Sequence, residues 1–342
     1  SAPPLSFSVR WKPRNRQTVG IAMIPLCIAL VLQWAPRPTL VVVNQSASTV
    51  SIIDLAEGKT LATLPTGHFP HEAAASADGR WAVVTDYGDR TAGSTITVLD
   101  LQSLTIARTI DIAPRNRPHS AAFLPDNHTL AVTCETSNAV LLIDVLTGAV
   151  TGQVSTQRRL SHMLALHPDA HHVYTANVAD GSLSAMDLEG KDSTRTLDVS
   201  LKTEGIGLNA AGTQVWMGSN VTDRVYMVDL ARWQVIDSLQ TGGMPYRIGF
   251  DPKGKVAVIT NPTSDEIRFV DPVTRKELGV LSVAGGATAA QPEGLTFSPD
   301  GTTAWVTLNG TAQAVEIDLA SRTIKRRFPV GEGPDGIAYV ER

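Results

Sequence analysis

The chain has 342 residues, of which 43% are hydrophobic and 18% are charged, so it is neither a disordered chain, nor a collagen, nor a coiled coil. Residues 1–39 hold five basic residues and no acidic one, which leaves 24 basic and 33 acidic residues, a net charge of −9, for residues 40–342. Nucleic-acid binding is therefore not expected, because affinity for phosphate depends on clustered lysine and arginine. The two cysteines, Cys27 and Cys134, are too few for a disulfide framework or a cysteine-rich zinc site.

An uncharged apolar run of 17 residues occupies positions 19–35, behind the basic tail of residues 1–18. This layout predicts an apolar helix over residues 19–36, outside the main domain, that acts as a signal peptide or a membrane anchor. Because a basic flank stays in the cytoplasm, we expect residues 37–342 to be exported to the bacterial periplasm or the outer face of the membrane. The protein would stay attached to the membrane if residues 19–35 are not cleaved. The alternative is a buried helix, but residues 40–342 form a closed domain without it.

Residues 40–342 contain seven copies of one unit, each recognised by an alternating apolar run that ends in aspartate. The seven aspartates are Asp54, Asp100, Asp144, Asp187, Asp229, Asp271 and Asp318. Their successive spacings of 46, 44, 43, 42, 42 and 47 residues are typical of a four-stranded propeller blade. A residue repeated in every copy is expected to be structural, holding a turn or a contact between blades.

Within each unit, apolar and polar residues alternate in four short runs, which predicts four short strands. Turn sequences such as SADGR, HPDAH and SPDGT separate these runs. Six full units fit between residues 71 and 333. The seventh is divided between the chain ends: residues 40–64 provide three strands, and residues 333–341 provide the missing inner strand. The sequence therefore predicts an all-β domain over residues 37–342, a seven-bladed β-propeller whose ring is closed by strands from both ends of the chain.

The repeated sequence resembles the bacterial YVTN-type seven-bladed β-propellers, a group that is similar to the haem-binding propeller of periplasmic nitrite reductase. The resemblance covers nearly all of residues 40–342 and rests on segments such as PEGLTFSPDGTTAWVT and VITNPTSDEIRFVD. It implies the fold and not a specific activity, because unrelated functions share this fold.

Two sets of residues are expected to converge on one face of the propeller, around the central channel. The first set opens each inner strand and consists of His71, His119, His162, Glu204, Tyr246, Glu293 and Asp335. The second set ends each second strand and consists of Asn44, Asp86, Cys134, Asn177, Ser219, Asn261 and Leu308, with Asn309 next to the last of these. Asn177, Asn261 and Tyr246 are candidates to bind a ligand at this face.

The most informative pattern is the presence of His71, His119 and His162 at the same place in three consecutive units, followed by Glu204 in the next. Imidazoles and a carboxylate aimed at one axis suit zinc, copper or iron, so these four residues are the candidate metal ligands. Two alternatives stay open: the histidines bond to neighbouring blades and to channel water, or they bind an anionic or haem-like ligand. His128, His167, His171 and His172 fall in or beside hairpin turns, where solvated side chains are expected.

Basic residues are frequent near the same face, and Arg115, Arg117 and Arg247 are candidate ligands for a carboxylate or phosphate. The alternative is that they are loop charges paired with nearby acids. Cys134 could add a thiolate to a metal site, but a buried structural cysteine is the commoner case.

Three functions fit this sequence. The first is an exported binding or scaffold module that recognises a small molecule or a protein at the channel mouth. The second is a metal-dependent enzyme that uses His71, His119, His162 and Glu204, with Glu293 or Asp335 as general base. The third is a propeller that binds a haem-like cofactor. The sequence lacks the motifs of serine hydrolases, zinc proteases and nucleotide-binding loops.

Overall fold

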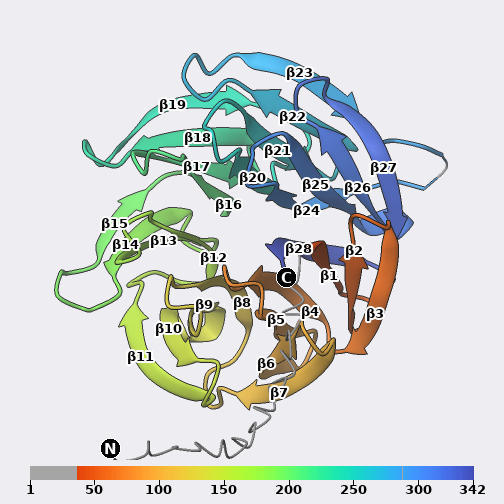
Figure 1. The fold of residues 1–342 in the computed structure, drawn as a ribbon. Coiled ribbons are helices and arrows are strands. Elements are labelled where there is room, and N and C mark those ends of the chain that lie inside the picture. Colours follow the sequence, from red (N-terminus) through yellow and green to blue (C-terminus); the bar gives the residue numbers. More distant parts are fainter. Residues whose placement is uncertain (1–36, 287) are drawn as a thin grey trace, which may run out of the picture. The chain divides into compact units, whose positions relative to one another are not determined.

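The computed structural model describes residues 37–286 and 288–342 (Figure 1). The predicted basic tail and apolar helix lie outside the described residues. Within the described part, the chain forms 28 strands and two short 3-10 helices, η1 (Glu135–Ser137) and η2 (Asn309–Thr311). No helix in this part is long and apolar enough to cross a membrane.

The strands form seven antiparallel sheets of four strands, here called blades 1 to 7, as the sequence predicts. Blade 1 contains β28 (Pro334–Glu341), β1 (Pro38–Asn44), β2 (Thr49–Asp54) and β3 (Lys59–Pro65). Blade 2 contains β4 (Pro70–Ala75), β5 (Trp81–Gly88), β6 (Ala92–Asp100) and β7 (Thr105–Asp111). Blade 3 contains β8 (Pro118–Phe123), β9 (Thr129–Cys134), β10 (Ala139–Asp144) and β11 (Ala149–Ser155). Blade 4 contains β12 (Ser161–Leu166), β13 (His172–Asn177), β14 (Ser182–Asp187) and β15 (Arg195–Asp198).

The last three blades follow the same order, written from the inner to the outer strand. Blade 5 contains β16 (Thr203–Leu208), β17 (Gln214–Ser219), β18 (Arg224–Asp229) and β19 (Gln234–Gln240). Blade 6 contains β20 (Arg247–Phe250), β21 (Ala257–Asn261), β22 (Glu266–Val270) and β23 (Glu277–Ser282). Blade 7 contains β24 (Pro292–Phe297), β25 (Thr303–Leu308), β26 (Gln313–Asp318) and β27 (Thr323–Pro329).

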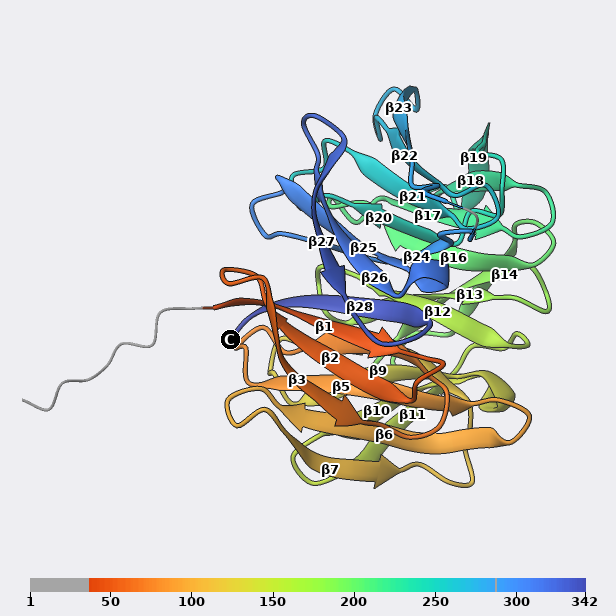
Figure 2. The same ribbon diagram turned by 90° about the vertical axis from the view of Figure 1, so that its right-hand side faces the viewer.

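Strands from both ends of the described chain close the ring within blade 1. β28 pairs antiparallel with β1, so that Thr39 lies opposite Val340 and Val41 opposite Ala338. Figure 2 shows β28, coloured blue, beside β1, coloured orange. The predicted closure is confirmed, and β28 also contacts the inner strands β4 and β24 of the two neighbouring blades.

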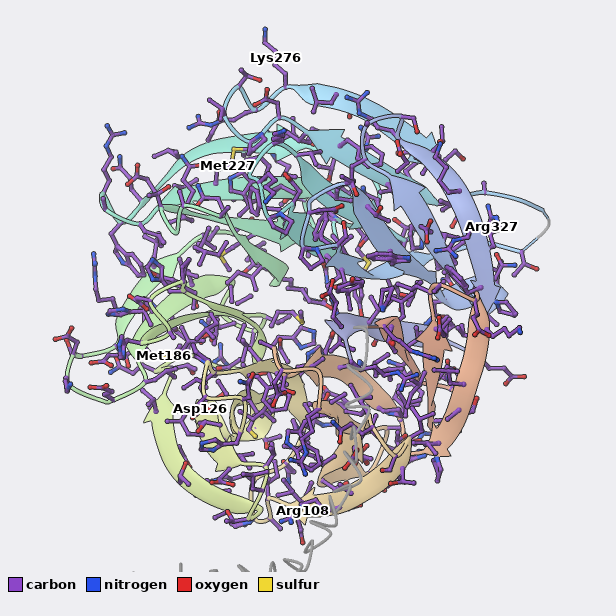
Figure 3. All side chains as sticks on the ribbon, viewed as in Figure 1. Arg108, Asp126, Met186, Met227, Lys276 and Arg327 are labelled. Carbon is purple, nitrogen blue, oxygen red and sulfur yellow. The ribbon has the colours of Figure 1, made fainter. Side chains whose placement is uncertain are left out.

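The hydrophobic core lies between adjacent blades. One cluster, for example, joins Val41 and Ile52 of blade 1 to Val84 and Leu99 of blade 2, and all four side chains are buried. In blade 1, the first two strands of the chain are covered on both faces, whereas the outer strand β3 is partly exposed. Side chains fill the spaces between the ribbons, and Arg108, Lys276 and Arg327 lie on the exposed rim (Figure 3).

The seven repeated aspartates hold the turns that follow the third strands. In each turn the carboxylate accepts hydrogen bonds from backbone N–H groups two to five residues further on, as Asp54 does from Ala56 and Glu57. The same arrangement recurs from Asp100 to Asp318. This confirms their structural role, because an aspartate side chain that bonds to the following backbone stabilises a turn.

Candidate functional site

The seven inner strands bring one polar or aromatic side chain each to the same end of the channel. In six blades this residue is the second of the inner strand, and in blade 6 Tyr246 directly precedes β20. The members are His71, His119, His162, Glu204, Tyr246, Glu293 and Asp335, here called the mouth ring. Since the inner strands are neighbours around one axis, residues far apart in the sequence meet here.

A repeated backbone conformation turns the chain into each inner strand. The residue two positions before each mouth-ring residue has a positive φ, between 46° and 60°, in all seven blades. These residues are Phe69, Arg117, Leu160, Lys202, Met244, Gln291 and Gly333. Only one is glycine, although the left-handed region is unfavourable for other residues. The fold thus imposes the same entry angle on all seven inner strands.

Threonines of the second strands fix the mouth ring from behind. The hydroxyl of Thr85 donates to the backbone carbonyl of His119 at 2.7 Å, and Thr133 donates to that of His162 at 2.5 Å. Thr260 and Thr307 make the same bond to Glu293 and Asp335. Each threonine also accepts the N–H that follows the mouth-ring residue of its own blade. The threonine of the repeat therefore links neighbouring inner strands.

The second predicted set lies inside the blades. Asn44 is buried and donates to Thr49 and Ser51 of the next strand, and Asn177 contacts Ser182 and Ser184 in the same way. Asn261 is also fully buried. The structure therefore places the candidate ligand-binding residues Asn177 and Asn261 within their own blades.

The residue after this second set is the one that reaches the mouth ring. It is Gln45, Tyr87, Glu135, Asn220 or Asn309, depending on the blade, and each contacts a mouth-ring side chain. A backbone hydrogen bond holds this residue beside the entry to the inner strand. The Glu135 N–H donates to the carbonyl of Arg117, and the Gln45 N–H donates to the carbonyl of Gly333. Four of these residues were not among the predicted site residues, although polar residues recur at this position in five of the seven copies: Gln45, Tyr87, Glu135 and Asn220.

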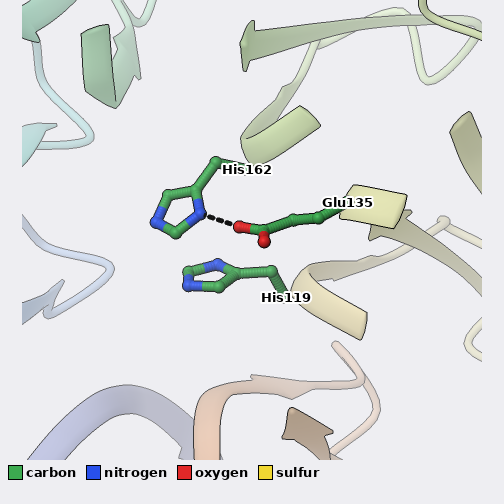
Figure 4. Close-up of side chains that lie close together, drawn as sticks. All are labelled: His119, Glu135 and His162. Carbon is green, nitrogen blue, oxygen red and sulfur yellow. Dashed lines mark hydrogen bonds and ion pairs between the residues drawn. The ribbon is translucent and has the colours of Figure 1, made fainter. Parts of the chain in front are cut away.

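Two of the predicted metal ligands, His119 and His162, come together with Glu135 (Figure 4). Each can offer one ligand atom such that the three atoms lie within 4.8 Å of one another. The centroids of the two imidazole rings are 3.6 Å apart, and Glu135 contacts Nδ1 of His162. Two imidazoles and a carboxylate form a typical donor set for zinc.

His119 is the least satisfied polar side chain of this group. It is fully buried, and within the described part of the chain neither of its ring nitrogens has a hydrogen-bond partner. Burial, together with the nearby His162, His71 and Arg247, holds its pKa well below the usual value. His119 is therefore neutral at physiological pH, which is the form that binds metal ions.

His162 lies between two carboxylates. Burial alone would lower its pKa, but its contacts with Glu135 and Glu204 raise that pKa to about 9. Glu204 accepts from Nε2 at 3.1 Å, and its own pKa falls to about 2 because the His162 bond outweighs burial. A metal-binding histidine is often oriented by a carboxylate bonded to the nitrogen that does not bind the metal. Glu204, bonded to Nε2, is therefore placed to orient His162 and is not one of the three metal donors His119, Glu135 and His162.

His71, the remaining predicted histidine ligand, bonds to the carboxylate of Asp335 and not to the group of His119, Glu135 and His162. Its Nδ1 is 2.9 Å from Oδ2 of Asp335, and Gln45 donates to the same oxygen at 3.0 Å. The His71 ring lies 4.9 Å from His119, and Tyr87 packs edge-on against both rings. His71 therefore forms part of the wall around His119.

An ion pair crosses the channel beside the mouth ring. Arg247 of blade 6 donates to Glu72 of blade 2, and it lies 3.7 Å from Asp335 of blade 1. All three side chains are largely buried, and the Arg247 guanidinium also stacks on the Tyr246 ring at 4.2 Å. Buried charges need such partners because the interior solvates ions poorly.

The two candidate general bases are poorly placed for that role. Burial and the nearby Asp335 raise the pKa of Glu293 to about 9, so this carboxyl group is protonated at neutral pH. Asp335 is fully buried and is already bonded to His71 and Gln45. A base must be ionised and within reach of its substrate.

Comparisons with known proteins identify relatives by fold alone. No family model and no curated protein matches the sequence. The chain is a seven-bladed β-propeller. It is similar to the solved structure of Kuenenia stuttgartiensis hydrazine synthase, with 14% identity, a TM-score of 0.70, and coverage of 80% of this chain and 95% of that one.

Two other solved structures share the propeller fold. A protein of unknown function from Desulfotomaculum acetoxidans is 10% identical, with a TM-score of 0.73 and coverage of 89% and 99% of the two chains. The dihydro-haem d1 dehydrogenase NirN, in complex with DHE, is 15% identical, with a TM-score of 0.65 and coverage of 88% of this chain and 74% of that one.

Two of the arginines predicted to bind a ligand, Arg115 and Arg117, already form hydrogen bonds within the protein. Arg115 donates to Gln153 at 2.8 Å, and Arg117 donates to the backbone carbonyl of Asp89 while it stacks on Tyr87. Cys134 is buried in the core between blades, and burial raises the pKa of its thiol to about 12. Such a thiol remains protonated, which fits the structural role.

Proposed function

We propose that this propeller is a binding module whose channel mouth holds a divalent transition-metal ion of the zinc class. His119, His162 and Glu135 would provide the protein ligands. The observation that carries the proposal is His119: a neutral imidazole, fully buried, whose two nitrogens lack protein partners in the described structure, beside two further donors. A buried polar group without a partner is costly, and a bound ion would satisfy it.

The surroundings support this assignment. Glu135 and Glu204 together carry two negative charges next to two imidazoles, which would offset the charge of a divalent ion. A tetrahedral zinc ion with bonds of about 2.0–2.1 Å to nitrogen holds its donors roughly 3.3 Å apart. Glu135 and His162, which are in direct contact, would therefore move apart to admit the ion. The ion would replace the proton that His162 and Glu135 share. Three protein ligands leave a fourth position for water or for a ligand of the module.

A haem-like ligand has weaker support. The fold is similar to that of NirN, which was solved in complex with DHE, but the likeness is of fold alone. The arginines expected to bind carboxylate groups already have protein partners: Arg115 bonds to Gln153, Arg117 to the carbonyl of Asp89, and Arg247 to Glu72. An absorption spectrum of the purified protein distinguishes the two ligands, because only the tetrapyrrole absorbs visible light strongly.

The direct test is zinc titration of the purified protein after treatment with a chelator, followed by calorimetry. We expect His119→Leu to remove one equivalent of bound zinc, whereas His128→Ala, at an exposed turn, leaves binding unchanged. Equal zinc binding by the wild-type protein and His119→Leu would overturn the proposal.

A further inference from the structure

A second cluster of metal-binding side chains lies at the other end of blade 4. His167 and Asp169 lie in the turn between β12 and β13, and His172 is the first residue of β13. One ligand atom of each lies within 4.8 Å of the others. β12 separates them from the channel mouth, because five residues from His162 to His167 span roughly 16 Å of extended strand. The cluster is therefore independent of the site proposed above.

The turn is built so that the three side chains face one another. The His167 N–H donates to the backbone carbonyl of His172, which closes the hairpin, and Ala170 adopts a positive φ of 61°. Asp169 accepts the backbone N–H groups of His171 and His172 through Oδ1. Its other oxygen, Oδ2, is thereby directed at the imidazoles, 2.9 Å from Nδ1 of His167 and 2.7 Å from Nδ1 of His172.

Both ring nitrogens of His167 have hydrogen-bond partners in the backbone. Its Nε2 lies 3.2 Å from the carbonyl oxygen of Gly212, and the backbone N–H of Asp169 donates to Nδ1 at 3.2 Å. In the neutral ring that satisfies both bonds, the proton is on Nε2 and Nδ1 is unprotonated. Nδ1 of His167 and Oδ2 of Asp169 are then 2.9 Å apart with no proton between them. A proton on Nδ1, or a metal ion that replaces the Asp169 N–H as the partner of the Nδ1 lone pair, makes this contact favourable.

This arrangement matches that of a metal-binding histidine, whose second nitrogen commonly donates to a backbone carbonyl. Next to the cluster is a pocket of about 330 Å³ at the seam between blades 4 and 5. Its lining includes all three side chains together with Tyr174, Arg195 and Trp233. Met186, labelled in Figure 3, also lines it. The pocket gives an ion access from solvent and leaves room for a further ligand.

We propose that His167, Asp169 and His172 form a second site for a divalent transition-metal ion, open to this pocket. From the sequence these histidines are expected to be solvated, because they lie in or beside the HPDA hairpin turn. The hairpin brings the three residues together. The guanidinium of Arg195, stacked 4.3 Å above Trp233, would favour a small anion as the remaining ligand of the ion.

The test is zinc calorimetry in a protein whose channel site has been removed by His119→Leu. In that background we expect one equivalent to bind. Addition of His172→Ala, or of Asp169→Asn, which retains an oxygen for the turn, should weaken binding at least tenfold. His171→Ala is the matched control, because this exposed neighbour contacts Glu189 and not the cluster, and it should leave binding unchanged.

The outcomes separate the two proposed sites. If the His119→Leu protein binds no zinc, or if His171→Ala and His172→Ala weaken binding equally, the second site is overturned while the channel site is unaffected. If the wild-type protein and His119→Leu bind the same single equivalent and His172→Ala removes it, the channel site fails and the second site stands. Circular dichroism confirms that each variant is folded.

Discussion

At the scale of single residues, His119 shows how a binding site differs from a core position. Its neighbours in the ring, His71 and His162, each have a carboxylate partner, whereas the buried nitrogens of His119 have none in the described structure. A protein selected for stability alone would place an apolar residue there. Residues that weaken a fold and strengthen binding are common at functional sites.

This difference predicts a gain in stability when the imidazole is removed. In zinc-free solution, His119→Leu should raise the free energy of unfolding by about 1 kcal/mol, because leucine buries no unpaired polar atom. Urea unfolding with a chelator present measures this change. In the presence of zinc the order should reverse, since only the wild-type protein gains stability from an ion at the channel mouth. A loss of more than about 1 kcal/mol in chelator would show that His119 is a structural residue.

At the scale of strands, the period-two patterns and the repeated aspartates correctly predict seven blades of four strands. The predicted inner strands open at the residues that form the mouth ring, because turn sequences mark where each strand begins. Four residues that reach the mouth ring were missed because the predicted set ended at the last residue of each second strand: Gln45, Tyr87, Glu135 and Asn220. Successive side chains alternate in direction, so that last residue faces into the blade and the next one faces the channel.

Contacts between distant blades could not be predicted from the sequence. Arg247 and Glu72 are 175 residues apart, and no local pattern relates them. The grouping of Glu135 with His119 and His162 likewise depends on how far each side chain extends into the channel. The repeat predicts which positions face the axis, but not which of them pair.

Asp86, near the end of a second strand, predicts that the stability of the fold depends on pH. Asp86 lies where blades 1, 4 and 6 have Asn44, Asn177 and Asn261, and it accepts from Thr95, Thr97 and the N–H of Gly67. Burial outweighs these bonds and raises its pKa from 3.8 to about 6. The folded state then binds a proton more tightly than the unfolded state, so stability falls as the pH rises from about 4 through 6.

Replacing Asp86 with asparagine, the residue found here in blades 1, 4 and 6, should remove this decrease in stability with rising pH. At pH 7 we expect Asp86→Asn to stabilise the protein by on the order of 2 kcal/mol, and at pH 4 by much less. Asn44 shows that an amide fits the site, since it bonds to Thr49 and Ser51 while its oxygen accepts the N–H of Gly331. Thermal unfolding at both pH values checks the prediction, and an equal effect at both would contradict it.

At the scale of the whole molecule, β28 closes the ring within blade 1. β28 covers the inner edge of β1, and it packs against the inner strands of two other blades. Deleting residues 334–342 should therefore abolish the cooperative thermal transition, because it leaves blade 1 without its inner strand and exposes buried residues such as Leu40 and Val42. Deleting Arg342 alone is the control. A truncated protein with an unchanged thermal midpoint would contradict the closure.

The location of the propeller remains a prediction from residues 1–36. The basic flank and the uncharged run predict that a reporter active only in an oxidising compartment, fused after residue 342, is active. Replacing two apolar residues of the run with arginine, by Ile24→Arg together with Ile28→Arg, should abolish export, because charged side chains in the middle of the run oppose insertion into the membrane. Activity of a cytoplasmic reporter alone would contradict the prediction.

The central claim is a metal ion at the channel mouth, and anomalous diffraction tests it most directly. The His172→Ala protein, which retains only the channel site, would be crystallised with one equivalent of zinc, and data would be collected at the zinc absorption edge. We predict one anomalous peak about 2.0–2.2 Å from a ring nitrogen of His119, a ring nitrogen of His162 and an oxygen of Glu135. A map of the folded protein without a peak among these three side chains would contradict the claim.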